Sequence, residues 1–200
     1  MSKQFPRNPL LESSIVRIAM VPSFSALSLA TNYAMIDLWN IKLMDAFIFL
    51  AAFLFGLEVG LGSAILTWGV YGFVNPYGQD DLILLLFLMV GESFYAIAGA
   101  LLSRTSIIRD LVQNNHRYKR ASFIFGIIGF QATFAYDLLT NFGSWLFKTA
   151  SLYQALITGV IVGAPFSILH EASNLVFFST VVPMSIVAVK RLGLTQEKSV

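Results

Sequence analysis

Residues 104–120, RTSIIRDLVQNNHRYKR, are the longest polar stretch in a chain that otherwise consists of long apolar runs. They contain five Lys and Arg residues and a single acid, Asp110. Basic loops of this kind lie on the cytoplasmic side of a bilayer in membrane proteins. The segment therefore predicts the inner side of the chain before any other feature is considered.

The apolar runs on either side of this loop are predicted to cross the membrane six times. If the runs cross the membrane in this order, all of the 13 Lys and Arg residues except Lys42 and Lys148 fall on the side of the basic loop. We therefore expect both termini to be cytoplasmic. The predicted spans, within one membrane domain of residues 1–200, are residues 15–35, 43–57, 60–74, 82–103, 121–141 and 167–189.

Composition supports an all-α integral membrane protein, because 56% of the residues are hydrophobic, only 12% are charged and the mean hydropathy is +0.73. Six spans leave little chain for a separate soluble catalytic domain. The formal net charge of +2 is too small to indicate a nucleic-acid partner, and without cysteine there is no thiol chemistry. Pro165 is predicted to end a short helix or re-entrant arm, Leu152 to Val162, before the sixth span begins.

Among the acids in predicted spans, Glu92, Asp137 and Glu171 are candidate functional residues, because an ionisable group inside a membrane is costly unless it is paired or hydrated. Asp137 shares a helix face with Asn141, and His170 shares one with Asn174, since each pair is four residues apart. Apolar walls with a few convergent polar groups are typical of small-molecule sites, so we expect a cavity that opens to the outside. Hydrogen bonds that merely hold helices together are the open alternative.

Enzyme motifs are incomplete in this chain. His170-Glu171 begins like a zinc-binding helix, but Asn174 stands where the second histidine is needed. No nucleophile elbow and no phosphate-binding loop is present. We expect no catalytic activity, no metal and no ATP site of its own.

A stripe of small residues, Ala26, Ala30 and Ala34, runs along the first predicted span at four-residue spacing. Such stripes let another helix approach closely in lipid. Spacing alone does not say whether that helix belongs to this chain or to another subunit.

Several motifs in order resemble the substrate-binding (S) components of energy-coupling factor (ECF) transporters. The resemblance covers nearly the whole chain, and it is carried by the alanine stripe, the stretch Trp39-Asn40-Ile41-Lys42-Leu43-x-Asp45, Gly56-xxx-Gly60-x-Gly62, Asn75-Pro76-Tyr77-Gly78, Tyr136-Asp137-Leu138-Leu139-Thr140-Asn141 and Pro165-Phe166 followed by His170-Glu171-Ala172-Ser173-Asn174.

The resemblance implies a six-helix protein in the cell membrane of a prokaryote that captures a water-soluble vitamin or related micronutrient from outside. Transport would be driven by a transmembrane coupling subunit and two cytoplasmic ATPases, which bind the ATP. The alanine stripe, Ala26, Ala30 and Ala34, would contact the coupling subunit. The implied substrate-binding residues are Trp39, Asn40, Glu92, Asp137, Asn141, His170, Glu171 and Asn174.

The start of the chain, Met1-Ser2-Lys3, lacks the histidine found in S components for nickel and cobalt, so a metal substrate is not expected. Acids outnumber bases in the expected cavity, which favours a neutral or cationic ligand such as a thiamine-like or pyrimidine compound. Two other functions stay open: a standalone secondary transporter that uses the buried acids, and a membrane structural or assembly protein.

Overall fold

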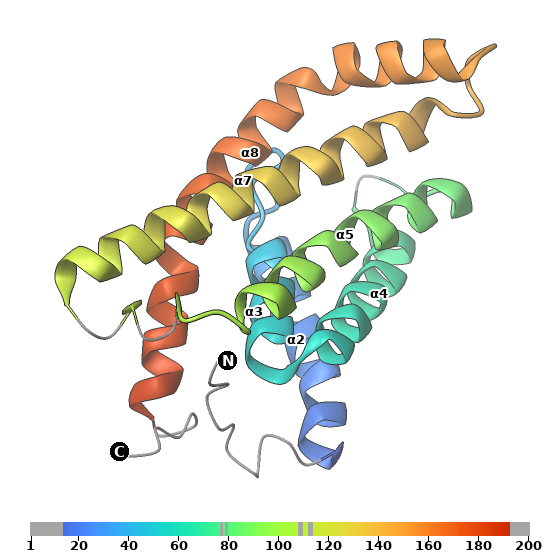
Figure 1. Cartoon of the computed structure of the whole chain (residues 1–200). Helices are drawn as coiled ribbons and strands as arrows, with labels where there is room; N and C mark the ends of the chain where they lie inside the picture. Colours follow the sequence, from blue (N-terminus) through green and yellow to red (C-terminus); the bar gives the residue numbers. More distant parts are fainter. Residues whose placement is uncertain (1–13, 77, 79, 108–109, 112–113, 193–200) are drawn as a thin grey trace.

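A computed structural model of the chain contains six helices and no strand over the residues it describes, which are 14–76, 78, 80–107, 110–111 and 114–192 (Figure 1). Five of the helices are long and apolar enough to cross a membrane, and α3 is shorter. The chain is therefore a multi-pass membrane protein. The helices are α2 (Ser14–Ala34), α3 (Met44–Phe55), α4 (Leu57–Val74), α5 (Leu82–Leu102), α7 (Asn115–Trp145) and α8 (Leu152–Arg191).

Polar side chains fix where three of the helices begin. Asp81 accepts a hydrogen bond from the backbone N–H of Leu84 at 2.8 Å, and Asn114 accepts one from Arg117 at 2.9 Å. Ser151 caps α8 in the same way. Each cap satisfies a backbone donor that the first helical turn leaves free, and so favours the start of the helix at that residue.

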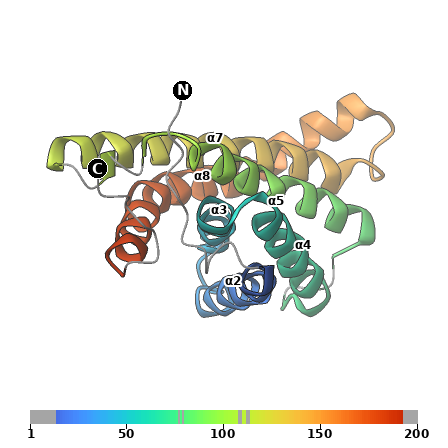
Figure 2. The ribbon, with the colours of Figure 1, turned by 60° about the horizontal axis from the view of Figure 1, so that its bottom comes forward.

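The helices form layers, with α7 and α8 side by side at one edge and α2 at the opposite edge (Figure 2). Between these layers lies α3, which packs against α2, α4, α5 and α8. Every residue of α3 except Phe47 and Leu54 is buried. The shortest and most apolar helix is thus the centre of the core.

Two glycines allow the chain to pack this closely around α3. Gly56 separates α3 from α4 and has a φ angle of 104°, a backbone conformation that residues with a Cβ atom rarely adopt. Gly99 on α5 lies against the backbone of α3, where a Cβ would overlap the carbonyl oxygen of Phe49. Small residues at such crossings let helices gain van der Waals contact that lipid cannot replace.

The predicted break at Pro165 is wrong, because α8 is one continuous helix of 40 residues. It contains both Pro165 and Pro183, and it bends along its course instead of stopping (Figure 1). Proline removes one backbone donor and kinks a helix, but in a membrane bundle neighbouring groups satisfy the freed carbonyl. There is accordingly no separate re-entrant arm over Leu152 to Val162.

The first four predicted spans agree with the helices within a few residues, whereas the sixth, 167–189, is only part of α8 and the fifth is too short. α7 extends from Asn115 to Trp145, several residues beyond each end of the predicted 121–141. Its first two turns carry Arg117, Lys119 and Arg120, which hydropathy assigned to the loop. Polar residues at a helix end read as a loop in a hydropathy profile, although their backbone is helical.

The alanine stripe lies on the exposed side of α2. Ala26, Ala30 and Ala34 are all exposed, whereas the buried residues of this helix are Ser25, Ser28 and Asn32. Among the described residues, the helices that α2 contacts are α3 and α4, on its other face. Within the described chain, the stripe is therefore not the packing surface for an internal neighbour.

We predict that Gly99→Ala destabilises the fold, because the new methyl group would meet the backbone of Phe49 and force α5 away from α3. Overpacking of this kind costs roughly 1–3 kcal/mol. Thermal unfolding of the detergent-solubilised protein should show a clearly lower midpoint. Gly69→Ala is the matched control, since its Cβ would meet only Met89 Cε at 3.6 Å. Equal midpoints for the two variants would contradict the close crossing.

Candidate functional site

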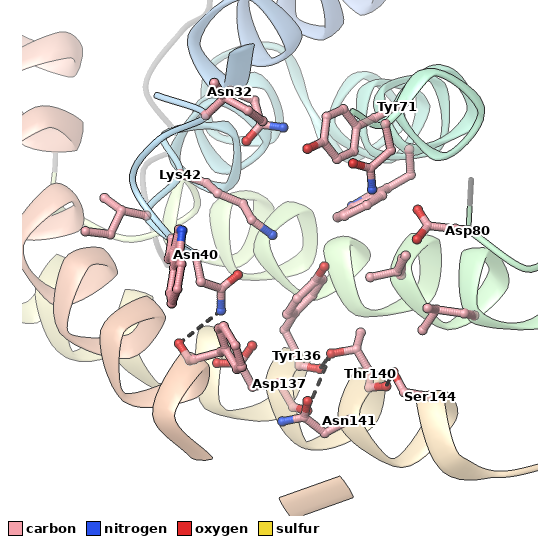
Figure 3. Close-up of a pocket in the computed structure, with 18 of the residues that line it drawn as sticks. Asn32, Asn40, Lys42, Tyr71, Asp80, Tyr136, Asp137, Thr140, Asn141 and Ser144 are labelled. Carbon is pink, nitrogen blue, oxygen red and sulfur yellow. Dashed lines mark hydrogen bonds between the residues drawn. The ribbon is translucent and has the colours of Figure 1, made fainter. Parts of the chain in front are cut away.

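A cavity of about 490 Å³ lies where α2, α4, α5, α7 and α8 converge around the α2–α3 connection (Figure 3). Its walls combine aromatic rings with carboxylates, amides and hydroxyls, which is the composition of a small-molecule site. The lining residues are Asn32, Met35, Ile36, Leu38, Trp39, Asn40, Ile41, Lys42, Trp68, Tyr71, Asn75, Asp80, Leu84, Leu88, Tyr136, Asp137, Thr140, Asn141, Ser144 and Phe166.

Beneath the cavity, His170 of α8 lies between two aspartates from different helices. Its Nδ1 is 2.9 Å from Asp137 Oδ1 on α7, and its Nε2 is 2.7 Å from Asp45 Oδ2 on α3. All three side chains are buried. This group, which we name the Asp–His–Asp triad, ties three helices together at one imidazole ring.

The geometry of the triad requires two protons. Each short contact between a ring nitrogen and a carboxylate oxygen is attractive only if a proton lies in it, and a neutral imidazole supplies one N–H. The second proton is on the other ring nitrogen or on one of the carboxyl groups. In either form the triad carries one net negative charge.

A hydrogen-bond network continues from the triad into the core. Asn174 Nδ2 lies 2.7 Å from Asp45 Oδ2 and 2.8 Å from Thr133 Oγ1. The hydroxyl of Tyr95 on α5 donates to the same Thr133 oxygen at 3.0 Å. Buried polar groups are stable in lipid only when they are satisfied in this way. The triad is therefore linked to α5 as well as to α3, α7 and α8.

A second buried acid contacts the cavity through an aromatic wall residue. Trp68 Nε1 donates to Glu92 Oε2 at 3.0 Å, and Trp68 itself lines the cavity. Glu92 Oε1 is buried and has no hydrogen-bond partner among the residues that the structure describes. Glu92 thus orients the indole ring from behind and does not itself face the cavity.

The α2–α3 connection is attached to α8 across the cavity rim. Asn40 Nδ2 donates to the backbone carbonyl of Phe166 at 3.0 Å, and the rings of Trp39 and Phe166 are 6.4 Å apart. Asn40 adopts φ of 54°, in the left-handed region that asparagine tolerates better than most residues. These contacts hold the connection over one side of the cavity, while the Trp39 ring remains largely exposed.

Two further charged residues, Lys42 and Asp80, line the cavity. Lys42 Nζ lies 5.4 Å from the centre of the Trp68 ring, in a cation–π arrangement. Asp80 follows α4, where partial burial raises the pKa of its carboxyl group above the usual value, and Asp81 adds to this while Lys42 opposes it. Asp80 consequently gains its proton at a higher pH than an exposed aspartate.

The eight residues predicted to bind substrate separate into three groups. Glu171 is partly exposed and does not line the cavity, although it follows His170 directly. Glu92, His170 and Asn174 are fully buried behind the cavity wall. The four that line the cavity are Trp39, Asn40, Asp137 and Asn141.

Sequence reasoning missed Asp45, Lys42 and Asp80 as site residues. Asp45 lies in the first turn of an otherwise apolar helix, where it resembles an interfacial acid, but it is only 1% exposed. Lys42 could have been recognised from its position, because it is one of the two basic residues that do not fall on the side of the basic loop. A charge that violates a topological rule is a candidate for a functional role.

We predict that His170→Ala strongly destabilises the protein, because it leaves two buried carboxylates without the group that carries their shared protons. Breaking a buried ion pair costs about 3–5 kcal/mol. Thermal unfolding in detergent at neutral pH is the measurement. His116→Ala is the control, as this histidine is exposed on α7. Similar midpoints for the two variants would show that the triad does not stabilise the fold.

Comparison of the chain with protein-family models, with curated proteins and with solved structures found no match. The evidence on function therefore comes from the cavity, the triad below it and the distribution of charge along the helices.

Proposed function

We propose that the chain is the membrane-embedded substrate-capture subunit of an ECF-type importer, which binds a water-soluble vitamin or related micronutrient from outside. The observation that carries this proposal is the cavity of about 490 Å³ among the helix ends. Its volume is in the range of small-molecule sites, and it combines aromatic walls with buried polar groups. A protein in which the acids only hold helices together has no need of such a cavity.

The distribution of basic residues supports an outward-facing cavity. α2, α4 and α7 end toward the cavity, so the beginning of α2 and the end of α8 lie at the other end of the bundle. That other end carries Arg17, Arg104, Lys190 and Arg191. By the positive-inside rule this end is cytoplasmic, and the cavity then opens to the outside of a prokaryotic cell membrane.

Energy for uptake would come from partner subunits. The sequence contains no phosphate-binding loop, so the proposal requires two cytoplasmic ATPases and a transmembrane coupling subunit. The exposed small residues Ala26, Ala30 and Ala34 on α2 offer a surface where a helix of the coupling subunit could pack closely. Exposure of the whole stripe supports this assignment.

A secondary transporter is a second candidate function, and the Asp–His–Asp triad is the observation that favours it. Shared protons in a buried carboxylate–imidazole group are typical of proton relays in transporters. Uptake by liposomes that contain this protein alone, driven by a proton gradient, would support the carrier and contradict the importer subunit.

A captured ligand should be detectable on the purified protein. The purified protein in detergent should bind one water-soluble vitamin tightly and saturably. Binding should change tryptophan fluorescence, because Trp39 and Trp68 line the cavity. Mass spectrometry of compounds that co-purify with the protein should identify the same ligand. Absence of any ligand across a vitamin panel would favour a structural or assembly role.

The alanine stripe of α2 should be required for assembly with the coupling subunit. Replacing Ala26 and Ala30 together by Leu should abolish uptake and complex formation in cells that contain the coupling module. Ligand affinity should be unchanged, since neither alanine lines the cavity. Ala188→Leu, at an exposed alanine of α8, is the control and should support uptake. Loss of affinity with an intact complex would contradict the assignment of this surface.

A further inference from the structure

We infer that the cavity takes a ligand with a positively charged nitrogen on or beside a flat ring, and that Asp137 Oδ2 binds that nitrogen. The inference rests on the proposed function, because it names the chemical class of the captured compound. Four observations carry it: the charge of the triad, the free oxygen of Asp137, the position of Lys42 and the aromatic walls.

The triad is a buried source of negative charge next to the cavity. Two carboxylates and one imidazole that share two protons retain one net negative charge, wherever the protons reside. Asp45 is surrounded by His170 and Asn174, which both contact its Oδ2 atom. Asp137 is the member of the triad that reaches the cavity wall. The negative charge is therefore available to a ligand at Asp137.

The second oxygen of Asp137 has no partner within the described chain. Oδ1 faces His170, whereas Oδ2 is buried and accepts no hydrogen bond. The residue is only 5% exposed, so bulk water does not solvate this oxygen fully. Burying an unsatisfied carboxylate oxygen is costly. A donor supplied by a ligand would remove that cost, and a charged donor would remove most of it.

No cation of the described chain neutralises Asp137 from the cavity side. Lys42, a cation that lines the cavity, extends over the Trp68 ring and forms no ion pair within 4.0 Å with a described carboxylate. Asp80 lies across the cavity from Asp137, and the Lys42 side chain projects into the space from the α2–α3 connection (Figure 3). Lys42 and Asp80 offset each other in formal charge. The excess negative charge of the cavity is then the charge of the triad.

The walls of the cavity fit a flat ring. Trp39, Trp68, Tyr71 and Tyr136 all line it, and the rings of Trp68 and Tyr71 meet edge to face at 5.6 Å. Aromatic faces stack on flat ligands and attract cations. An anionic ligand would instead face the triad and the negative faces of these rings. The combination of a carboxylate anchor and aromatic walls therefore selects a cationic heterocycle.

The test uses the full chain in detergent and isothermal titration calorimetry at pH 7. The probes are two cations, thiamine and 1-methylnicotinamide, two neutral compounds, nicotinamide and riboflavin, and two anions, nicotinate and biotin. Because 1-methylnicotinamide, nicotinamide and nicotinate share one ring, they differ chiefly in charge. We expect a cation to bind most tightly, and 1-methylnicotinamide to bind about 10-fold or more tightly than nicotinate.

Asp137→Asn isolates the proposed contact. Asparagine keeps an oxygen that accepts from His170 but replaces the free oxygen by an N–H donor, so the fold is preserved and the anchor is lost. Loss of a charge-assisted hydrogen bond should weaken binding of the cations about 10-fold to 100-fold. Nicotinamide should change by no more than about 3-fold. Lys42→Met should strengthen binding of the cations, since it removes a like charge.

Asp110→Asn is the control variant, because Asp110 pairs with Arg117 at 3.2 Å on the far side of the bundle. Its affinities should equal those of the natural protein, and unfolding midpoints should confirm that all variants are folded. Preference for an anion or a neutral compound, or binding that depends on Lys42 and not on Asp137, overturns the inference while the capture function stands. Failure of every probe to bind overturns both.

Discussion

The structure depends on the two contacts that His170 makes with Asp45 and Asp137. They join α3, α7 and α8 at a depth where separated charges would be severely destabilising. Each contact gives a buried carboxylate a hydrogen bond that lipid could not provide. Asn174 and Thr133 continue the hydrogen-bond network to Tyr95 on α5. A membrane bundle lacks a strong hydrophobic force between its helices, so a shared polar centre fixes their relative positions more firmly than apolar contact alone.

The same interaction shapes the cavity. Asp137 holds His170 through one oxygen and also lines the cavity, so one side chain contributes both to the stability of the bundle and to the proposed binding site. The α2–α3 connection closes part of the rim through Asn40 and Phe166. A ligand in the cavity would thus touch the element that covers it and the triad beneath it. Affinity for such a ligand would depend on the packing of α7 against α8.

Hydropathy was a good guide to the helices and a poor guide to their ends. Most predicted spans lie within a few residues of the observed helices, because an apolar run of membrane length has few alternatives to a helix. Pro165 was misread as an end, since a lone proline stops an isolated helix but only bends one whose neighbours satisfy its backbone. The polar groups were partly predicted: Asp137 contacts His170, and Asn174 is linked to His170 through Asp45, which was overlooked. Glu171 does not line the cavity.

The amino-acid sequence by itself determined that the chain is helical and enters a membrane several times, because length and hydropathy are properties of single segments. Of the four acidic and histidine side chains that are buried in the described chain, it identified Glu92, Asp137 and His170 and missed Asp45. Only the tertiary structure decided which of those groups are neighbours. Asp45 and His170 are separated by 125 residues, and their contact depends on how α3 and α8 cross. The face that an apolar helix presents to its neighbours is set by glycine crossings such as Gly99 and by polar pairing across helices, and a pattern that is apolar on every face does not encode it.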